Sequence, residues 1–179
     1  MKFTIKGTED ITVKDLIALE SGPIAFVAAM TKQTIEQVRN IPANVFETLK
    51  KECEAQFALV TPKDPRKIKI GDTTFSIVPD FMAFEAGAVI DISEADEIDK
   101  TKYLTTVLSA LFRPEVSRVG GRYEVEQYTA KQRPELLDLP LQYYRGAEVF
   151  FSGINAKLMK TSLNSLSDQV AKMKRELSK

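Results

Sequence analysis

The sequence contains no histidine and a single cysteine, and both facts restrict the chemistry open to it. Without an imidazole base for a serine or cysteine nucleophile, the usual hydrolytic triads are excluded, and so is a zinc site built from histidine and cysteine. One cysteine cannot form an internal disulfide. Cys53 lies at helical spacing from Leu49 and Phe57, which is typical of a small buried apolar residue. Carboxylate, lysine and tyrosine chemistry remains.

Net charge and long hydrophobic runs are also absent. The chain has 25 lysine and arginine residues against 25 aspartate and glutamate residues. It therefore has no long-range field that would attract nucleic acid or an anionic membrane. Its apolar runs are far shorter than the ~20 residues that cross a bilayer, and its first residues lack the apolar core of a signal peptide. We expect a cytoplasmic protein that neither binds nucleic acid nor inserts into a membrane.

A chain of 179 residues with 44% hydrophobic residues can bury a substantial core. Its patterns predict an α+β fold that is mostly helical, with two β-hairpins and a long C-terminal helix. We divide it into an N-terminal strand with short helices (1–60), a hairpin-helix-hairpin-helix core (61–158) and a C-terminal amphipathic helix (159–179). The three segments are expected to form one compact domain.

The first sixty residues carry clear helix signals. Phe3 and Ile5 alternate with polar residues and predict a short opening strand. Thr12, with Asp15 three residues later, is typical of a helix start, and Gly22-Pro23 ends that helix.

Two further helices are expected in this segment. Thr31 repeats the pattern of a helix start, with Met30 and Ile35 in the hydrophobic staple positions. Pro42 suits the first turn of a helix that runs to about Phe57.

Two hairpins are expected in the middle of the chain. Residues 68–70 and 75–77 can pair across Gly71-Asp72, and Val116 can pair with Val125 across Gly120-Gly121. Between the hairpins we predict a helix over 82–92 and another that begins at Asp99 and ends before Arg113-Pro114. The paired glycines favour a hairpin turn over a phosphate loop, because they are followed directly by Arg122-Tyr123 and not by a lysine with a serine or threonine after it.

Charged side chains gather in two groups. The acidic group can supply oxygen ligands for a divalent cation, but capping of helix N-termini is the preferred interpretation. The arginines can form an anion site or, more often, pair with carboxylates. The acidic group is Asp91, Glu94, Asp96, Glu97 and Asp99, and the arginines are Arg113, Arg118, Arg122 and Arg145.

The C-terminal third shows continuous apolar periodicity. Phe150 and Phe151 lie in an apolar helical stretch, and beyond them apolar residues recur at alternating steps of four and three, the repeat of a coiled-coil seam. Such a seam can pack on its own domain or on a partner. The predicted partner-binding residues are Phe150, Phe151 and the six seam residues Met159, Leu163, Leu166, Val170, Met173 and Leu177.

Most of the chain resembles a known group of proteins. The stretch LSALFRPEVSRVGGRYEVEQY, continued by LPLQYYRGAEVFFSGINAKLMKTSLNSL, resembles small baseplate-hub and tail-assembly proteins of T-even-type bacteriophages. The hairpin KIKIGDTTFSIVPDFMAFEAGAVIDI and the opening ITVKDLIAL are similar as well. The resemblance implies a protein that helps to build the phage tail tip, or forms part of it, without catalysing a reaction.

From these features we expect a non-enzymatic tail or baseplate-hub protein that acts in tail assembly, as a chaperone or a structural component of the virion. It would need no cofactor, bind other tail or baseplate proteins, and be found in the host cytoplasm and in the virion tail. A homo-oligomer formed through the seam remains open. The alternatives are a metal-dependent enzyme that uses the acidic group and a host cytoplasmic adaptor or chaperone.

Overall fold

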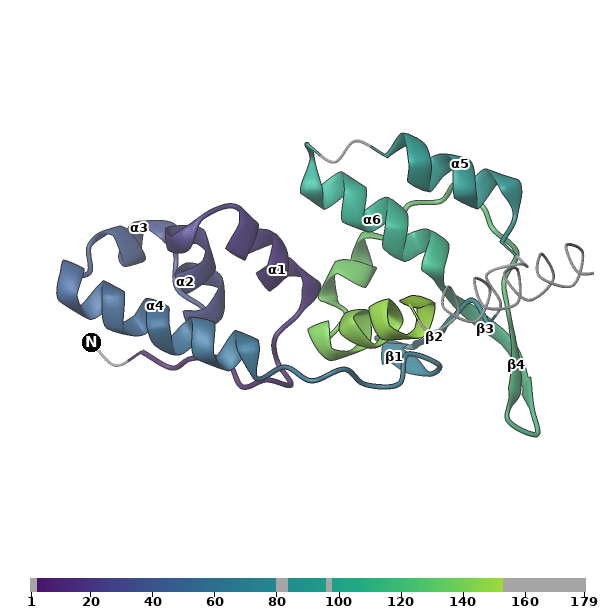
Figure 1. Cartoon of the computed structure of the whole chain (residues 1–179), viewed down its shortest axis with the longest axis horizontal. Coiled ribbons are helices and arrows are strands. Elements are labelled where there is room, and N and C mark those ends of the chain that lie inside the picture. The colour runs from purple at the N-terminus through teal and green to yellow at the C-terminus, as the bar shows by residue number, and fades with distance from the viewer. Residues whose placement is uncertain (1–2, 80–83, 96–97, 153–179) are drawn as a thin grey trace, which may run out of the picture. The chain divides into compact units, whose positions relative to one another are not determined.

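The structure is a computed structural model that describes residues 3–79, 84–95 and 98–152. The chain divides into two compact units, Met1–Ala147 and Glu148–Lys179, so that all but five of the described residues belong to the first. The fold is α+β, as predicted, and combines helices with a four-stranded antiparallel sheet. Figure 1 labels these elements along the chain.

The structure confirms two predictions, that a helix begins after Thr12 and that it is broken at Gly22-Pro23. Helix α1 (Val13–Glu20) begins after Thr12, whose backbone N–H donates to Asp15 Oδ2 at 2.8 Å. Asp15 is almost fully buried, and Lys6 Nζ lies 2.7 Å from its Oδ1. Gly22 has a φ of +115°, which favours glycine, and Pro23 then opens α2 (Pro23–Thr31).

Two expectations for the N-terminal segment are wrong. Phe3 and Ile5 form no strand; instead they pack against the helical core, and the Lys6 N–H donates to the Met30 carbonyl at 2.9 Å. Alternation alone cannot make a strand when no described segment offers it a ladder to join.

The helix start placed at Thr31 is the second error. Thr31 is the last residue of α2, and Thr34 caps α3 (Ile35–Arg39) by accepting from the Gln37 N–H at 3.2 Å. The Gln37 side chain accepts in turn from the Thr34 N–H at 2.8 Å, so glutamine completes the capping box three residues after the true cap.

Helix α4 (Ala43–Ala58) follows Pro42 and contributes to the main core, close to the predicted extent. Cys53 is fully buried there, and burial raises the pKa of its thiol to about 11, so the thiol is inert at neutral pH. The buried apolar residues of this core come from α2 to α4, from the residues next to α1 and α4, and from the helix 141–152: Ile11, Phe26, Val27, Ala28, Met30, Val38, Leu49, Cys53, Phe57, Val60 and Leu141. Helix α1 contributes partly buried side chains that pack against them.

The two predicted hairpins form one sheet. Strands β1 (Ile68–Ile70) and β2 (Thr73–Ile77) flank the turn at Gly71, which has a φ of +57°. Strands β3 (Phe112–Val119) and β4 (Arg122–Val125) flank Gly120 and Gly121. The order is β1-β2-β3-β4, because β2 also pairs with β3.

The register of the second hairpin differs from the prediction. Val125 lies opposite Glu115 instead of Val116, because the ladder is irregular between Glu115 and Ser117. A bulge of this kind places an additional residue on one strand and leaves it unpaired. Val116 is accordingly 65% exposed.

Two helices separate the hairpins. Helix α5 (Ala86–Glu94) overlaps the predicted helix 82–92 but ends two residues later, and residues 80–83 lie outside the described part. Helix α6 (Lys100–Leu111) begins after Asp99, whose side chain accepts from the Lys102 N–H at 3.0 Å, and runs directly into β3. Figure 1 shows α5 beside α6, and the two are in contact.

The chain then forms the 3-10 helix η2 (Pro134–Asp138) and a helix over 141–152. The predicted C-terminal helix over 159–179 lies outside the described residues. The proposed division at residues 60 and 158 therefore stays a prediction.

Candidate functional site

Two of the eight predicted partner-binding residues lie in the described part of the chain. Phe150 and Phe151 are on the helix 141–152 and are each partly buried. Their rings meet edge to face, with centroids 5.5 Å apart and an interplanar angle of 85°. Val149 beside them is 59% exposed. The other six, Met159, Leu163, Leu166, Val170, Met173 and Leu177, lie outside the described residues.

Two of the three described members of the acidic group, Asp91 and Asp99, have structural roles. Asp91 accepts a hydrogen bond from the Tyr128 hydroxyl, and burial together with that bond raises the pKa of Tyr128 to about 12. Asp99 caps α6, and Glu94 is exposed at the end of α5. Over residues 3–79, 84–95 and 98–152, no three histidine, cysteine or carboxylate side chains come together as metal ligands.

Arg113 is the most buried of the four arginines named above as a possible anion site. It is 4% exposed, and its Nη1 lies 2.8 Å from Glu85 Oε1. Its guanidinium carbon lies over the rings of Phe84 and Tyr128, at 5.6 and 5.3 Å from their centroids. The hydrogen bond from Arg113 lowers the pKa of Glu85 to about 2. This pair ties the start of α5 to β3.

Two further arginines also have internal partners. Arg118 donates from Nε and Nη2 to the carboxylate of Glu115, at 2.8 and 2.6 Å. Arg145 donates to the backbone carbonyl groups of Val60 and Phe57. These contacts favour arginines that bind groups within the chain over arginines that form an anion site.

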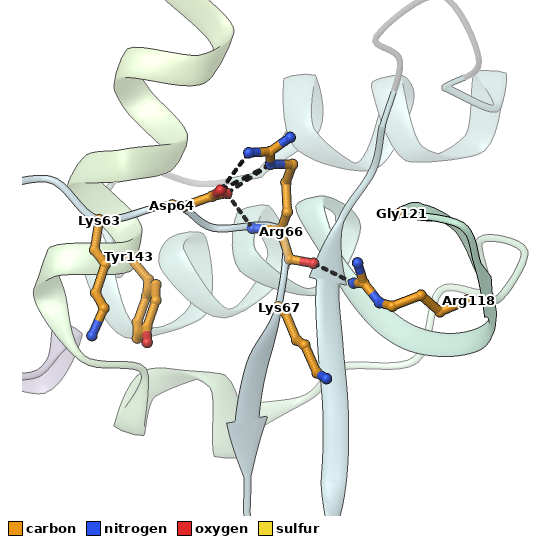
Figure 2. Close-up of a pocket in the computed structure, with 7 residues that line it drawn as sticks. All are labelled: Lys63, Asp64, Arg66, Lys67, Arg118, Gly121 and Tyr143. Atoms are coloured by element: carbon orange, nitrogen blue, oxygen red, sulfur yellow. Dashed lines mark hydrogen bonds and ion pairs between the residues drawn. The ribbon is translucent and has the colours of Figure 1, made fainter.

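A basic pocket of about 370 Å³ lies between three separate parts of the first unit. We call it the connector pocket, because most of its residues come from the connector between α4 and β1. Figure 2 shows this lining with the side chains drawn as sticks. The residues are Lys63, Asp64, Arg66 and Lys67 of the connector, Arg118 and Gly121 of the second hairpin, and Tyr143 of the helix 141–152.

Backbone contacts hold the connector in place around this pocket. The Lys63 N–H donates to the Gln142 carbonyl at 2.9 Å, and Arg118 Nη2 donates to the Arg66 carbonyl at 2.8 Å. Gly146 permits the close approach, because a Cβ built there would lie 1.8 Å from the Lys63 carbonyl oxygen. The helix 141–152 and the second hairpin thus fix the path of the connector from opposite ends.

The charges of the connector pocket divide into paired and unpaired groups. Arg66 Nε donates to both carboxylate oxygens of Asp64, at 2.9 and 3.0 Å, and this contact lowers the pKa of Asp64. Lys63 Nζ lies 5.4 Å from the centroid of the Tyr143 ring. Among the described residues, neither Lys63 nor Lys67 has a carboxylate within ion-pair distance.

Sequence reasoning missed the connector pocket. It grouped arginines by type and overlooked the run from Lys63 to Lys67, in which three of five residues are basic. That run follows Pro62, contains Pro65 and ends just before a strand, and it is the signal that could have found the pocket.

None of the helices in the described residues is long and apolar enough to span a membrane. Comparisons with protein-family models, with curated proteins and with solved structures found no match to this chain.

Proposed function

We propose that this chain is a non-enzymatic phage tail or baseplate-hub protein that acts in tail assembly. In this role it binds other tail proteins through apolar helical surfaces, as an assembly chaperone or as a structural component. The observation that carries the proposal is the apolar periodicity from Ala147 to Leu177. The resemblance of the hairpin and helix motifs to tail-assembly proteins supplies the kind of partner.

The apolar stripe that this periodicity predicts needs a surface to cover it. An isolated helix of about three heptads is marginal in water, so a seam of this length needs another surface to bury its apolar side chains. At such interfaces a few large aromatic and aliphatic anchors contribute most of the binding energy. We propose Phe150 and Phe151 as the aromatic anchors; their rings meet edge to face, and Val149 beside them is exposed.

The chemistry of the described residues supports binding over catalysis. The buried carboxylate of Asp15 accepts from Lys6 and from the Thr12 backbone, and Glu85 and Glu115 are bound to arginines. Asp91 accepts from a tyrosine. Each of these acids thus has a partner that stabilises the fold, and nothing in the described part favours the metal-dependent enzyme.

The proposed sites of action follow from the proposed partners. The protein would meet tail or baseplate proteins in the host cytoplasm during assembly and could remain in the virion tail. A homo-oligomer through the seam is compatible with either role, because one apolar stripe can pack against a copy of itself.

The experiment replaces Leu163 and Leu166 with aspartate and measures tail assembly in a phage that lacks its own copy of this gene. Two charges in the seam should abolish partner binding and reduce completed tails at least about tenfold, since charges at interface anchors cost several kcal/mol. Circular dichroism checks that the variant is folded. The matched control is Asn164→Asp with Ser165→Asp, which adds the same charges between the seam positions. Normal tail yield from a folded Leu163→Asp/Leu166→Asp variant would contradict the proposal.

A further inference from the structure

The connector pocket presents two lysine ammonium groups that form no ion pair with an acid of the described residues, although the charge of Lys67 helps to lower the pKa of Glu115. In Figure 2 the side chains of Lys63 and Lys67 both run downward, away from the guanidinium group of Arg66, with Lys63 on the left beside Tyr143 and Lys67 to its right. Both residues are exposed, and neither has an ion-pair partner in the part of the chain that the structure describes. The pocket therefore offers positive charge to a ligand from outside the chain.

The two arginines of the pocket are already occupied and serve as its frame. Arg66 is bound to Asp64, and Arg118 donates to Glu115 and to the Arg66 carbonyl. Arg118 also lies over the Tyr123 ring, 4.8 Å from its centroid. Each guanidinium group thus uses its Nε–Nη2 edge, one of the two edges with which arginine can recognise phosphate, to bind a partner within the chain. The two ammonium groups, which act as point charges on flexible stems, are the basic groups of the pocket without such a partner.

We infer that the connector pocket receives an acidic segment of a partner protein, with carboxylate side chains on Lys63 and Lys67. This inference rests on the proposed function, because it assigns a second contact to the same tail-assembly partner. The stems of the two lysines leave the backbone four residues apart, so one extended segment with several acidic side chains can reach both. The ring of Tyr143, beside Lys63, gives that segment an apolar surface to lie on.

The geometry favours a protein segment over other anions. Small molecules are bound in sites that bury most of their surface, whereas the side chains of Asp64 and Arg66 here are 54% and 61% exposed. A nucleic acid would need a long-range positive field, and the chain has equal numbers of basic and acidic residues. An acidic segment attached to a partner needs only a local contact, since the partner's other contacts raise its effective concentration.

The test measures binding of a fluorescein-labelled hexaglutamate peptide to the full chain by fluorescence anisotropy at low ionic strength. Hexaglutamine and an oligothymidine of similar length are the comparison probes. Replacing both Lys63 and Lys67 with alanine should weaken hexaglutamate binding about tenfold, as expected for the loss of two exposed ion pairs. Lys63→Arg with Lys67→Arg should retain binding because it keeps both charges. The matched control is Lys51→Ala with Lys131→Ala, which removes two exposed charges elsewhere.

Each outcome decides for or against the inference. If only the Lys63→Ala/Lys67→Ala variant loses hexaglutamate binding, the inference is supported. If the Lys51→Ala/Lys131→Ala variant loses as much binding, the peptide is attracted by overall charge and the inference is overturned. Absence of binding, or tighter binding of oligothymidine than of hexaglutamate, would also overturn it. The Leu163→Asp/Leu166→Asp variant separates the two proposals. This variant should bind hexaglutamate normally although it fails in tail assembly. Peptide binding thus tests the connector pocket, and tail assembly tests the seam, independently of each other.

Discussion

Two helical glycines show how differently the same residue type can be used. Gly146 lies on the helix 141–152 against the connector, where a Cβ would lie 1.8 Å from the carbonyl oxygen of Lys63. Gly87 lies on α5, where a Cβ would lie 3.6 Å from the ring of Tyr128, an ordinary van der Waals contact. Gly146 is therefore required by packing, and Gly87 is not.

Alanine at these two positions should change stability in opposite directions. Gly146→Ala should lower the free energy of unfolding by about 2 kcal/mol, because the backbone of the connector must move away. Gly87→Ala should raise it by about 0.5 to 1 kcal/mol, since alanine loses less conformational freedom in a helix. Urea unfolding followed by circular dichroism measures both. Equal effects of the two substitutions would refute the close contact at Lys63.

At the scale of elements, α5 is held to the sheet by polar contacts more than by a large apolar face. Ala88 is its only fully buried residue, while Val89 and Ile90 are 47% and 51% exposed. Its attachments are the Glu85–Arg113 ion pair before its first turn and the hydrogen bond from Tyr128 to Asp91. We expect α5 to depend on charge, and hence on pH.

The pH dependence follows from the lowered pKa of Glu85. This pKa falls from 4.5 to about 2 in the folded protein, so the charged carboxylate is favoured by folding. The resulting stability is complete above about pH 4.5 and is lost as the pH falls toward 2. A Glu85→Gln variant should be less stable at pH 7 by about 1 kcal/mol, a value reduced because the Glu85 side chain is 40% exposed.

Thermal unfolding between pH 2 and pH 7 tests this expectation. The difference in stability between the wild type and Glu85→Gln should shrink as the pH falls from about 4.5 to about 2. Glu94→Gln, at the exposed end of the same helix, is the control and should behave like the wild type. A difference that is constant across this range would show that Glu85 acts through its shape and not its charge.

At the scale of the whole molecule, the main core lies within the first unit. Among the described residues, the buried members of the core cluster end at Leu141, with Tyr144 packed against them, and the sheet ends at Val125. The proposed partner-binding seam lies after the described part of the chain. Folding and partner binding should therefore be separable by truncation.

A chain that ends at Ser152 tests this separation. It should unfold with a midpoint temperature within about 3 °C of the full chain, which corresponds to less than about 1 kcal/mol. It should lose tail assembly, because it lacks the six seam residues from Met159 to Leu177. Differential scanning calorimetry measures the first property. A loss of several kcal/mol would instead show that the seam packs on its own domain, which is the alternative to partner binding.

Features set by neighbouring residues were predictable from the order of amino acids alone. The capping contact of Asp15 with Thr12, the cap at Asp99, the helix break at Gly22-Pro23 and the turn at Gly71 all join residues within a few positions of one another. Their energetics are local, so a pattern of residue types is sufficient. The apolar periodicity after Ala147 can be recognised in the sequence for the same reason. Which surface covers it is not a local property, and that part of the candidate site stays a prediction.

Long-range packing determined the rest. The pairing of β2 with β3 joins two hairpins into one sheet, and the irregularity between Glu115 and Ser117 shifts the register of the second. The connector pocket brings Lys63, Arg118 and Tyr143 together from distant parts of the chain. A sequence pattern does not predict which distant residues come together, because their proximity depends on close backbone contacts such as that of Gly146 with Lys63. Local chemistry thus specified the elements, while the burial of one element against another decided which charges meet and which remain free to bind.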